Sequence, residues 1–170
     1  SDVYKRQVKL NRELRIGLIA FASVPLVISP ITEDSQSLLN ALPAINTDLA
    51  SLKGSRLDDA LERAKQLLGS GDSGRSILLI SDGDFEQIGL SEKVRELHRD
   101  GVTLHVLGIG TPGGGPIPAQ AGQSDLLRDR SGKIIESRLN YRLLNQLAEA
   151  GGGRYLQADF RDEDSETILE

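Results

Sequence analysis

A chain of 170 residues is long enough to bury the core of one domain, and 38% hydrophobic with 26% charged residues is typical of a folded protein. The formal net charge of −5 argues against a nucleic-acid-binding protein, whose affinity would come from a basic surface. The chain has no cysteine, which excludes disulfides, thiolate metal sites and thiol nucleophiles.

The two ends differ from the part between them. The sequence starts at Ser1 and has no methionine, and residues 1–7 look like translated adapter sequence, so we leave them out of the fold prediction. Residues 8–160 are expected to form the domain and residues 161–170 a polar C-terminal extension. No apolar run approaches the roughly 18–20 residues of a membrane helix.

Two strands and two helices are predicted in the first half. The apolar runs from Arg15 to Ala22 and from Pro25 to Ser29 indicate strands joined by a tight turn. Asp34 or Ser35 can cap the helix that follows. Its apolar residues are Leu38, Leu39, Leu42 and Ile45. Helical spacing then predicts a second helix with one apolar face, formed by Leu57, Ala60, Leu61, Ala64, Leu67 and Leu68.

The second half repeats the alternation. Ile77 to Ile80 and Val102 to Ile109 read as strands buried on both faces, and Gly153 to Ala158 as a last strand. Helices are predicted around Leu90, Val94 and Leu97, closed by Gly101, and after Asn140 around Leu143, Leu144, Leu147 and Ala148. Residues 110–122 are too rich in Gly and Pro for regular structure, and residues 125–139 indicate a hairpin. We therefore predict an α/β fold with a doubly wound, mostly parallel open sheet.

The strand from Ile77 to Ile80 runs directly into Ser81-Asp82-Gly83-Asp84. In open α/β sheets, ligands bind beyond the carboxyl ends of the strands, so Asp82 lies where a site is expected. The alternative is that Asp82 and Asp84 only shape a turn, since Asp-Gly is a common turn signal. The residues by themselves leave both interpretations open.

Ser55 is a second candidate, because it follows Gly54 directly before a predicted helix. Its simplest role is to cap that helix. A hydroxyl is also a hard oxygen ligand, and magnesium favours oxygen ligands with few carboxylates and several retained waters. Ser55 and Asp82 are expected on loops that leave the same edge of a parallel sheet, so they could share one ion.

Enzymatic signatures are weak. Gly108 to Gly113 matches G-x-G-x-x-G, but the prolines and glycines after it prevent the helix that a dinucleotide site requires. His98 and His105 are the only histidines and are predicted to be structural. There is no serine-nucleophile elbow and no P-loop.

The order of these segments resembles the von Willebrand factor A domain. RIGLIAFAS from Arg15, GIGTPGGGPIP from Gly108 and the stretch from Asp129 to Tyr155 are similar to the Bat aerotolerance branch of that family. The resemblance extends from about Arg12 to Ala158. It places Ser55 in the second loop of a metal-ion-dependent adhesion site, where Thr is commoner, and it places Asp82, in preference to Asp84, in the third.

The first loop of that site carries D-x-S-x-S, which does not occur in this sequence. The first, central strand would precede Arg12 and is expected to be missing, so residues 8–160 are expected to form an incomplete domain. Two ligand positions remain, and we therefore expect only weak binding of Mg²⁺ or Mn²⁺. Losing four or five buried side chains would cost on the order of 10 kcal/mol, so we also expect marginal stability.

The resemblance implies a metal-dependent protein-binding domain rather than an enzyme, with a carboxylate of the partner completing the ion site. It also implies a bacterial envelope parent, anchored in the inner membrane with this domain in the periplasm, acting in an aerotolerance complex. The alternative is a metal-independent structural module whose sheet edge and Gly-Pro loop mediate assembly. A nucleotide-dependent enzyme is a third and weaker hypothesis.

Overall fold

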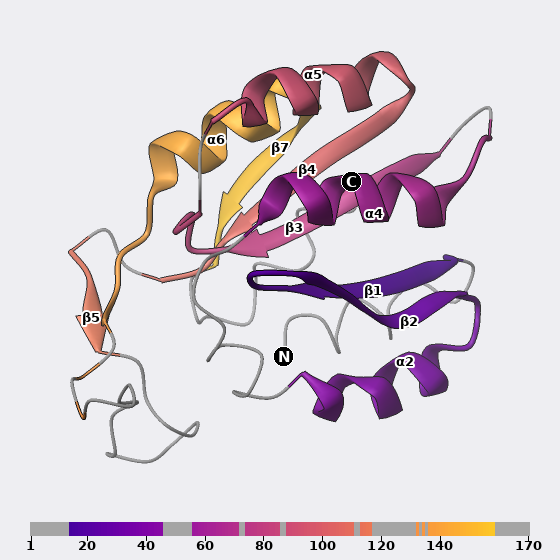
Figure 1. Ribbon diagram of the computed structural model, residues 1–170, viewed down its shortest axis with the longest axis horizontal. Helices are drawn as coiled ribbons and strands as arrows, with labels where there is room; N and C mark the ends of the chain where they lie inside the picture. Colours follow the sequence, from indigo (N-terminus) through magenta and orange to yellow (C-terminus); the bar gives the residue numbers. More distant parts are fainter. Residues whose placement is uncertain are drawn as a thin grey trace.

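The computed structural model describes residues 14–45, 56–71, 74–85, 88–110, 113–116, 132, 134 and 136–158 (Figure 1). Within these ranges strands and helices alternate along the chain, which confirms the predicted α/β class. The proposed adapter segment and the polar C-terminal extension lie outside the described residues.

The first two strands form an antiparallel hairpin. β1 (Ile16–Phe21) pairs with β2 (Pro25–Thr32), which is longer than predicted. The helices α2 (Ser35–Ala41) and α4 (Leu57–Leu68) pack against the hairpin from opposite sides (Figure 1).

The helix α2 starts at the predicted cap and ends earlier than predicted. The Asp34 carboxylate accepts the backbone N–H groups of Gln36 at 3.0 Å and Ser37 at 3.2 Å. Pro43 then lies in a 3₁₀ turn, η1 (Leu42–Ala44), because proline lacks the N–H that an α-helix needs. Ile45, expected on the helix, lies beyond it with 42% of its surface exposed.

A parallel sheet holds the main core. Its strands are β3 (Arg75–Ser81), β4 (Val102–Gly108) and β7 (Gly152–Gln157), in the order β3-β4-β7. The helices α5 (Leu90–Arg99) and α6 (Tyr141–Ala150) pack on it, and α4 contributes to the same apolar cluster. Members of this cluster include Leu61, Leu79, Val94, Leu104, Val106 and Leu144. The central strand β4 is therefore the most deeply buried.

Three consecutive glycines explain how β7 lies so close to β4. A Cβ on Gly153 would be 2.0 Å from the Leu104 carbonyl oxygen, and one on Gly151 would be 2.5 Å from Leu104 Cβ. Any side chain there would push the strand off its neighbour. The sequence GGG at 151–153 is thus a packing requirement of the sheet.

A pair of short strands differs from the prediction. β5 (Gly115–Pro116) pairs with β6 (Glu136–Ser137), so residues 110–122 are not wholly irregular. The hairpin predicted over residues 125–139 falls mostly outside the described residues. The described strand β6 pairs instead with β5, which precedes the predicted hairpin in the chain. Local sequence signals cannot predict such a pairing.

The described strands fall into separate sheets, with β1 and β3 in different ones. Among the described strands, β1 pairs only with β2, and β3 pairs only with β4. All six residues of β1 are half-buried, whereas most residues of β4 are buried. Phe21 of β1 and Ile77 of β3 nevertheless pack against the same core cluster, so one apolar core joins the hairpin to the parallel sheet.

Candidate functional site

Asp82 lies at the carboxyl edge of the parallel sheet, where three backbone hydrogen bonds tie the strand ends together. The Asn140 N–H donates to the Asp82 carbonyl at 2.7 Å, and the Ile109 N–H donates to the Ser81 carbonyl at 3.0 Å. The Ala158 N–H donates to the Gly108 carbonyl at 2.7 Å. Asp82 is therefore fixed between the end of β4 and the start of α6, where open α/β sheets hold their ligands.

The turn after β3 is shaped by its own polar groups. The Ser81 hydroxyl accepts the Gly83 N–H at 3.1 Å, and Oδ1 of Asp82 accepts the Asp84 N–H at 3.0 Å. Phe85 ends the turn with its ring in the core cluster. Asp82 therefore has the turn-forming role that the sequence left open. A carboxylate has about four acceptor positions, and this bond uses one of them.

Asp82 and Asp84 are not equivalent. Asp82 is half-buried and organises the turn through its side chain, whereas Asp84 is exposed and contributes its backbone N–H to that turn. Asp82 is consequently the more firmly held side chain of the two, and its preference over Asp84 as a metal ligand stays a prediction.

Ser55 lies outside the described residues, but its neighbour Arg56 does not. The Arg56 N–H donates to the carbonyl of Ala22, directly after β1, at 2.8 Å. The loop that leads into α4 is therefore tethered where β1 ends. The N-cap position of α4 is Arg56, and its side chain makes no capping hydrogen bond. The interpretation of Ser55 as an N-cap falls on a residue outside the described ones and stays a prediction.

Of the two predicted metal ligands, Asp82 lies among the described residues and Ser55 does not. The described residues contain no group of three or more His, Cys, Asp or Glu side chains able to hold an ion. The Asp82 carboxylate is a hard oxygen donor and suits Mg²⁺, which keeps most of its waters when it binds few protein ligands. The chemistry of this carboxylate fits the ion, and the affinity for the ion stays a prediction.

The histidines are accounted for structurally. Nδ1 of His105 accepts the Arg154 N–H at 3.2 Å, which links β4 to β7. Burial, followed by the positive charge of Arg154, lowers the pKa of His105. The His98 ring covers Gly152, where a Cβ would lie 2.3 Å from Cε1. Both side chains have packing roles away from the Asp82 turn, as predicted.

The nucleotide hypothesis gains no support from the described part of residues 108–116. β4 ends at Gly108 and Gly115–Pro116 forms β5, so no described helix begins there. A dinucleotide site would need the N-terminal N–H groups of such a helix.

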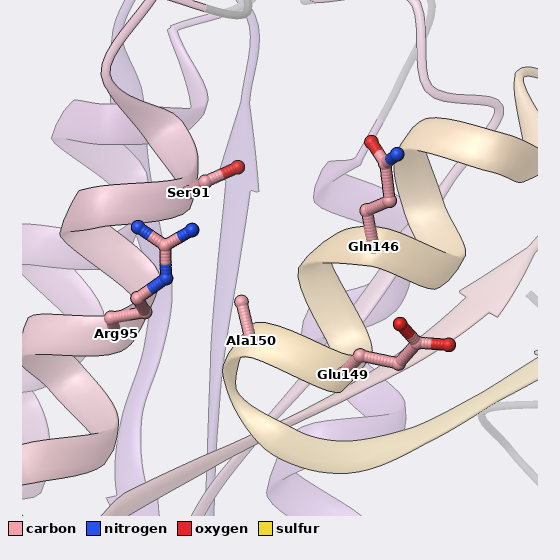
Figure 2. Close-up of a pocket in the computed structure, with 5 residues that line it drawn as sticks. All are labelled: Ser91, Arg95, Gln146, Glu149 and Ala150. Atoms are coloured by element: carbon pink, nitrogen blue, oxygen red, sulfur yellow. The ribbon is translucent and has the colours of Figure 1, made fainter.

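Other surface features were not found from the sequence. Tyr141 and Ile109 flank the Asp82 turn with 46% and 41% of their surfaces exposed. A polar hollow of about 410 Å³ between α5 and α6 is lined by Ser91, Arg95, Gln146, Glu149 and Ala150 (Figure 2). Arg95 pairs with Glu92 at 2.9 Å and Glu149 accepts from Asn145 at 2.7 Å, so these charges already have partners. No sequence motif marks either feature.

None of the described helices has the length and apolar character needed to cross a membrane.

Comparisons with known proteins agree with this geometry. A profile of the von Willebrand factor type A domain matches residues 2–85. The structure of BatB from Bacteroides thetaiotaomicron is 31% identical, with a TM-score of 0.86, over 98% of this chain and 82% of that one. An aerotolerance-related membrane protein from Bacteroides fragilis, carrying multiple mutations to serine, is 29% identical with a TM-score of 0.84, over 99% and 83% of the two chains.

A more distant structure has the same fold. Proximal thread matrix protein 1 from the mussel byssus, with a zinc-occupied MIDAS motif, is 14% identical with a TM-score of 0.62, over 99% of this chain and 40% of that one. Comparison with curated proteins gives no significant match.

Proposed function

The chain belongs to the von Willebrand factor type A domain family, and from that premise we propose that it binds a protein partner through a divalent ion at the carboxyl edge of its sheet. Its similarity to Bat proteins supports a protein-interaction domain. The proposed ion is Mg²⁺ or Mn²⁺, and the proposed ligands are Asp82 and Ser55.

The observation that carries the proposal is the position of Asp82. Its backbone carbonyl is held by Asn140 and its carboxylate by the turn, so the side chain is presented from a rigid edge. Arg56, directly after Ser55, is tethered to the end of β1 by Ala22. These bonds support a shared location for the two loops. The zinc-occupied motif of the mussel protein supports a divalent ion in this fold.

Each residue has a proposed role. Asp82 would hold the ion through water and Ser55 would hold it directly, while a carboxylate of the partner would complete its oxygen shell. When bound, the ion would supply a positive charge that attracts an acidic side chain of the partner. Binding, and not bond-breaking chemistry, is the proposed activity.

Calorimetric titration with MgCl₂ or MnCl₂ tests the ion site. We expect a millimolar Kd, because only two protein ligands are proposed. Asp82→Asn should abolish the binding, and Asp84→Asn, which keeps the turn N–H, should preserve it. Submillimolar affinity would contradict the weak-site prediction, and equal losses in the two variants would contradict the assignment to Asp82.

A bacterial inner-membrane parent with this domain in the periplasm is also proposed. The support is that the Bacteroides fragilis relative is described as an aerotolerance-related membrane protein. Fractionating cells that express the full-length parent, followed by protease treatment of spheroplasts, tests this. Protection of the domain in intact spheroplasts would contradict a periplasmic location.

The second candidate function is metal-independent structural assembly, and the separation of β1 from β3 among the described strands favours it. The double variant Ser55→Ala/Asp82→Ala in the full-length parent distinguishes the two functions. Unchanged partner binding would favour assembly, and lost binding in a folded variant would favour the ion site.

A further inference from the structure

We propose that Tyr141 and Arg142 form a second anchor for a protein partner at the sheet edge that carries Asp82, and that this anchor binds an acidic segment with an apolar side chain beside its carboxylate. The anchor needs no metal ion. It rests on the proposed function only for the place where the partner lies. The position of the pair, its internal contacts, the charge of Arg142 and the apolar side chains around it support the proposal.

Backbone hydrogen bonds place the pair beside the Asp82 turn. The Asn140 N–H donates to the Asp82 carbonyl at 2.7 Å. Tyr141 and Arg142 follow directly as the first two residues of α6, which begins at the carboxyl end of the sheet (Figure 1). A Cβ on Gly83 would lie 3.0 Å from Asn140 Cβ, so the turn also packs on the start of this helix. A partner bound over Asp82 would therefore have the pair next to it.

Tyr141 orients the Arg142 guanidinium. Nε of Arg142 donates to the Tyr141 hydroxyl at 3.2 Å, and the guanidinium carbon lies 5.9 Å from the centre of the Tyr141 ring. This second distance falls within the range of a cation–π contact. The bond through Nε leaves the two Nη groups, which can together hold both oxygens of a carboxylate. The pair thus presents an exposed aromatic ring and an oriented pair of donors on one surface.

The positive charge of Arg142 has no carboxylate beside it within the part of the chain that the structure describes. Several basic side chains of α4 and α5 differ, because carboxylates pair with them; they are Lys65, Lys93, Arg95 and Arg99. The chain as a whole is acidic, with a formal net charge of −5, so an acidic partner needs a local positive group of this kind. A carboxylate is therefore the complementary group on the partner.

Exposed apolar side chains lie at the same edge. Ile109 follows β4, and its N–H donates to the Ser81 carbonyl at 3.0 Å. Ile88 directly precedes the N-cap of α5 with 85% of its surface exposed. Apolar and aromatic side chains around a charged group are typical of protein-binding surfaces, and Tyr and Arg are enriched among the residues that dominate their affinity. The proposed occupant is therefore a protein segment and not a small anion.

Two carboxylates near the pair oppose an acidic segment. Asp82 lies in the adjoining turn, and Asp84 is exposed two residues later. Their negative charges should keep the affinity of the anchor alone low, and an ion bound at Asp82 would offset them. The anchor and the proposed ion site should therefore strengthen each other, although each can be removed without the other.

NMR titration of the full chain in EDTA tests the anchor without any ion. The probe is a blocked peptide of sequence Gly-Leu-Asp-Glu-Leu-Gly, and the control is Gly-Leu-Asn-Gln-Leu-Gly, which has nearly the same shape and no charge. We expect the probe to shift the signals of Tyr141, Arg142 and Ile109 with a millimolar Kd, and the control to bind at least about fivefold more weakly. Absence of probe binding in EDTA, or equal binding of the two peptides, would overturn the proposal.

Matched variants locate the anchor. Arg142→Gln should weaken probe binding about fivefold, whereas Arg99→Gln, at the opposite end of α5, should leave it unchanged. Arg142→Lys keeps the charge without the pair of Nη donors and should restore only part of the affinity. Tyr141→Ser should also weaken binding, and Leu14→Ser, at a similarly exposed position before β1, should not. Equal effects of Arg142→Gln and Arg99→Gln, in variants that circular dichroism shows to be folded, would overturn the assignment.

Repeating the titrations in MgCl₂ separates this proposal from the proposed function. Asp82→Asn should remove the gain in affinity that Mg²⁺ gives without weakening the binding in EDTA, and Arg142→Gln should weaken binding in both buffers. Probe binding in EDTA with no gain from Mg²⁺ would contradict the ion site and support the anchor. Binding that Mg²⁺ strengthens and that Arg142→Gln does not change would overturn the anchor and leave the ion site intact.

Discussion

Gly83 fixes the shape of the turn that presents Asp82. Its φ is 85°, and a Cβ there would lie 3.0 Å from Asn140 Cβ and 3.2 Å from Leu144 Cγ. The turn is therefore packed directly on the start of α6. Only a residue without a side chain combines this backbone angle with this contact.

We predict that Gly83→Ala lowers the free energy of unfolding more than Gly89→Ala does. Gly89 has a similar φ of 74°, and a Cβ added there would meet nothing within 4 Å, so its substitution reports backbone strain alone, roughly 1–2 kcal/mol. Gly83→Ala adds the clash with α6, about 1–3 kcal/mol. Urea unfolding of both variants measures the difference. Equal losses would show that the turn does not pack on α6.

His105 makes stability depend on pH. Its folded pKa lies below the ordinary value of 6.5, chiefly because of burial, so the unfolded chain binds the proton more readily. The contribution of neutral His105 to the free energy of unfolding is complete above pH 6.5. It declines as the pH falls below that value. We predict that the free energy of unfolding decreases between about pH 7 and 5 and that His105→Gln flattens this slope. An unchanged slope in the variant would contradict the role of His105.

Arg75 connects three elements at the end of the domain opposite to Asp82. Its guanidinium donates to the Gly69 carbonyl at 2.7 Å, after α4, and to the Asp100 carbonyl, after α5. Arg75 itself starts β3. These bonds satisfy carbonyl groups at two helix ends, which would otherwise lack partners within their helices.

Arg75→Met should therefore lower the free energy of unfolding by about 1.5–3 kcal/mol, because hydrogen bonds from a charged group to two elements are lost. Arg99→Met provides the matched control. Arg99 is 67% exposed and pairs with Glu92 at 2.9 Å, so its loss should cost less than about 1 kcal/mol. Chemical unfolding of both variants measures the two losses of free energy of unfolding. A larger loss for Arg99→Met than for Arg75→Met would contradict the role of Arg75 in joining the three elements.

Local signals predicted most elements because caps and periodicity act within a few residues. Asp34 and Asn140 cap the helices that they were expected to cap. The strand from Ile77 to Ile80 was predicted to be buried on both faces, but only Leu79 is buried and its apolar neighbours are half-buried. Pairings between distant segments were missed, such as β5 with β6. Asp82 could be predicted as a candidate because it directly follows a strand in the sequence. The hydrogen bond that its backbone carbonyl accepts from Asn140 could not be predicted, because it joins residues that are far apart in the chain.

On the scale of the whole molecule, we expect the separation of β1 from β3 among the described strands to limit stability. The half-buried side chains of β1 leave apolar surface that stabilises the fold only in part. We predict a thermal midpoint below about 50 °C, or one that rises with protein concentration as chains associate. Differential scanning calorimetry with sedimentation at several concentrations checks this. A cooperative, monomeric transition above about 50 °C would contradict it.

The central claim is that Asp82 belongs to a weak ion site on the carboxyl edge of the sheet, and paramagnetic broadening of amide NMR signals by Mn²⁺ tests it most directly. We predict that the ion broadens the signals of residues 81–84 before those of the α5 and α6 hollow, and that Asp82→Asn removes this effect while Asp84→Asn keeps it. Broadening that persists in Asp82→Asn, or that begins elsewhere on the surface, would contradict the account.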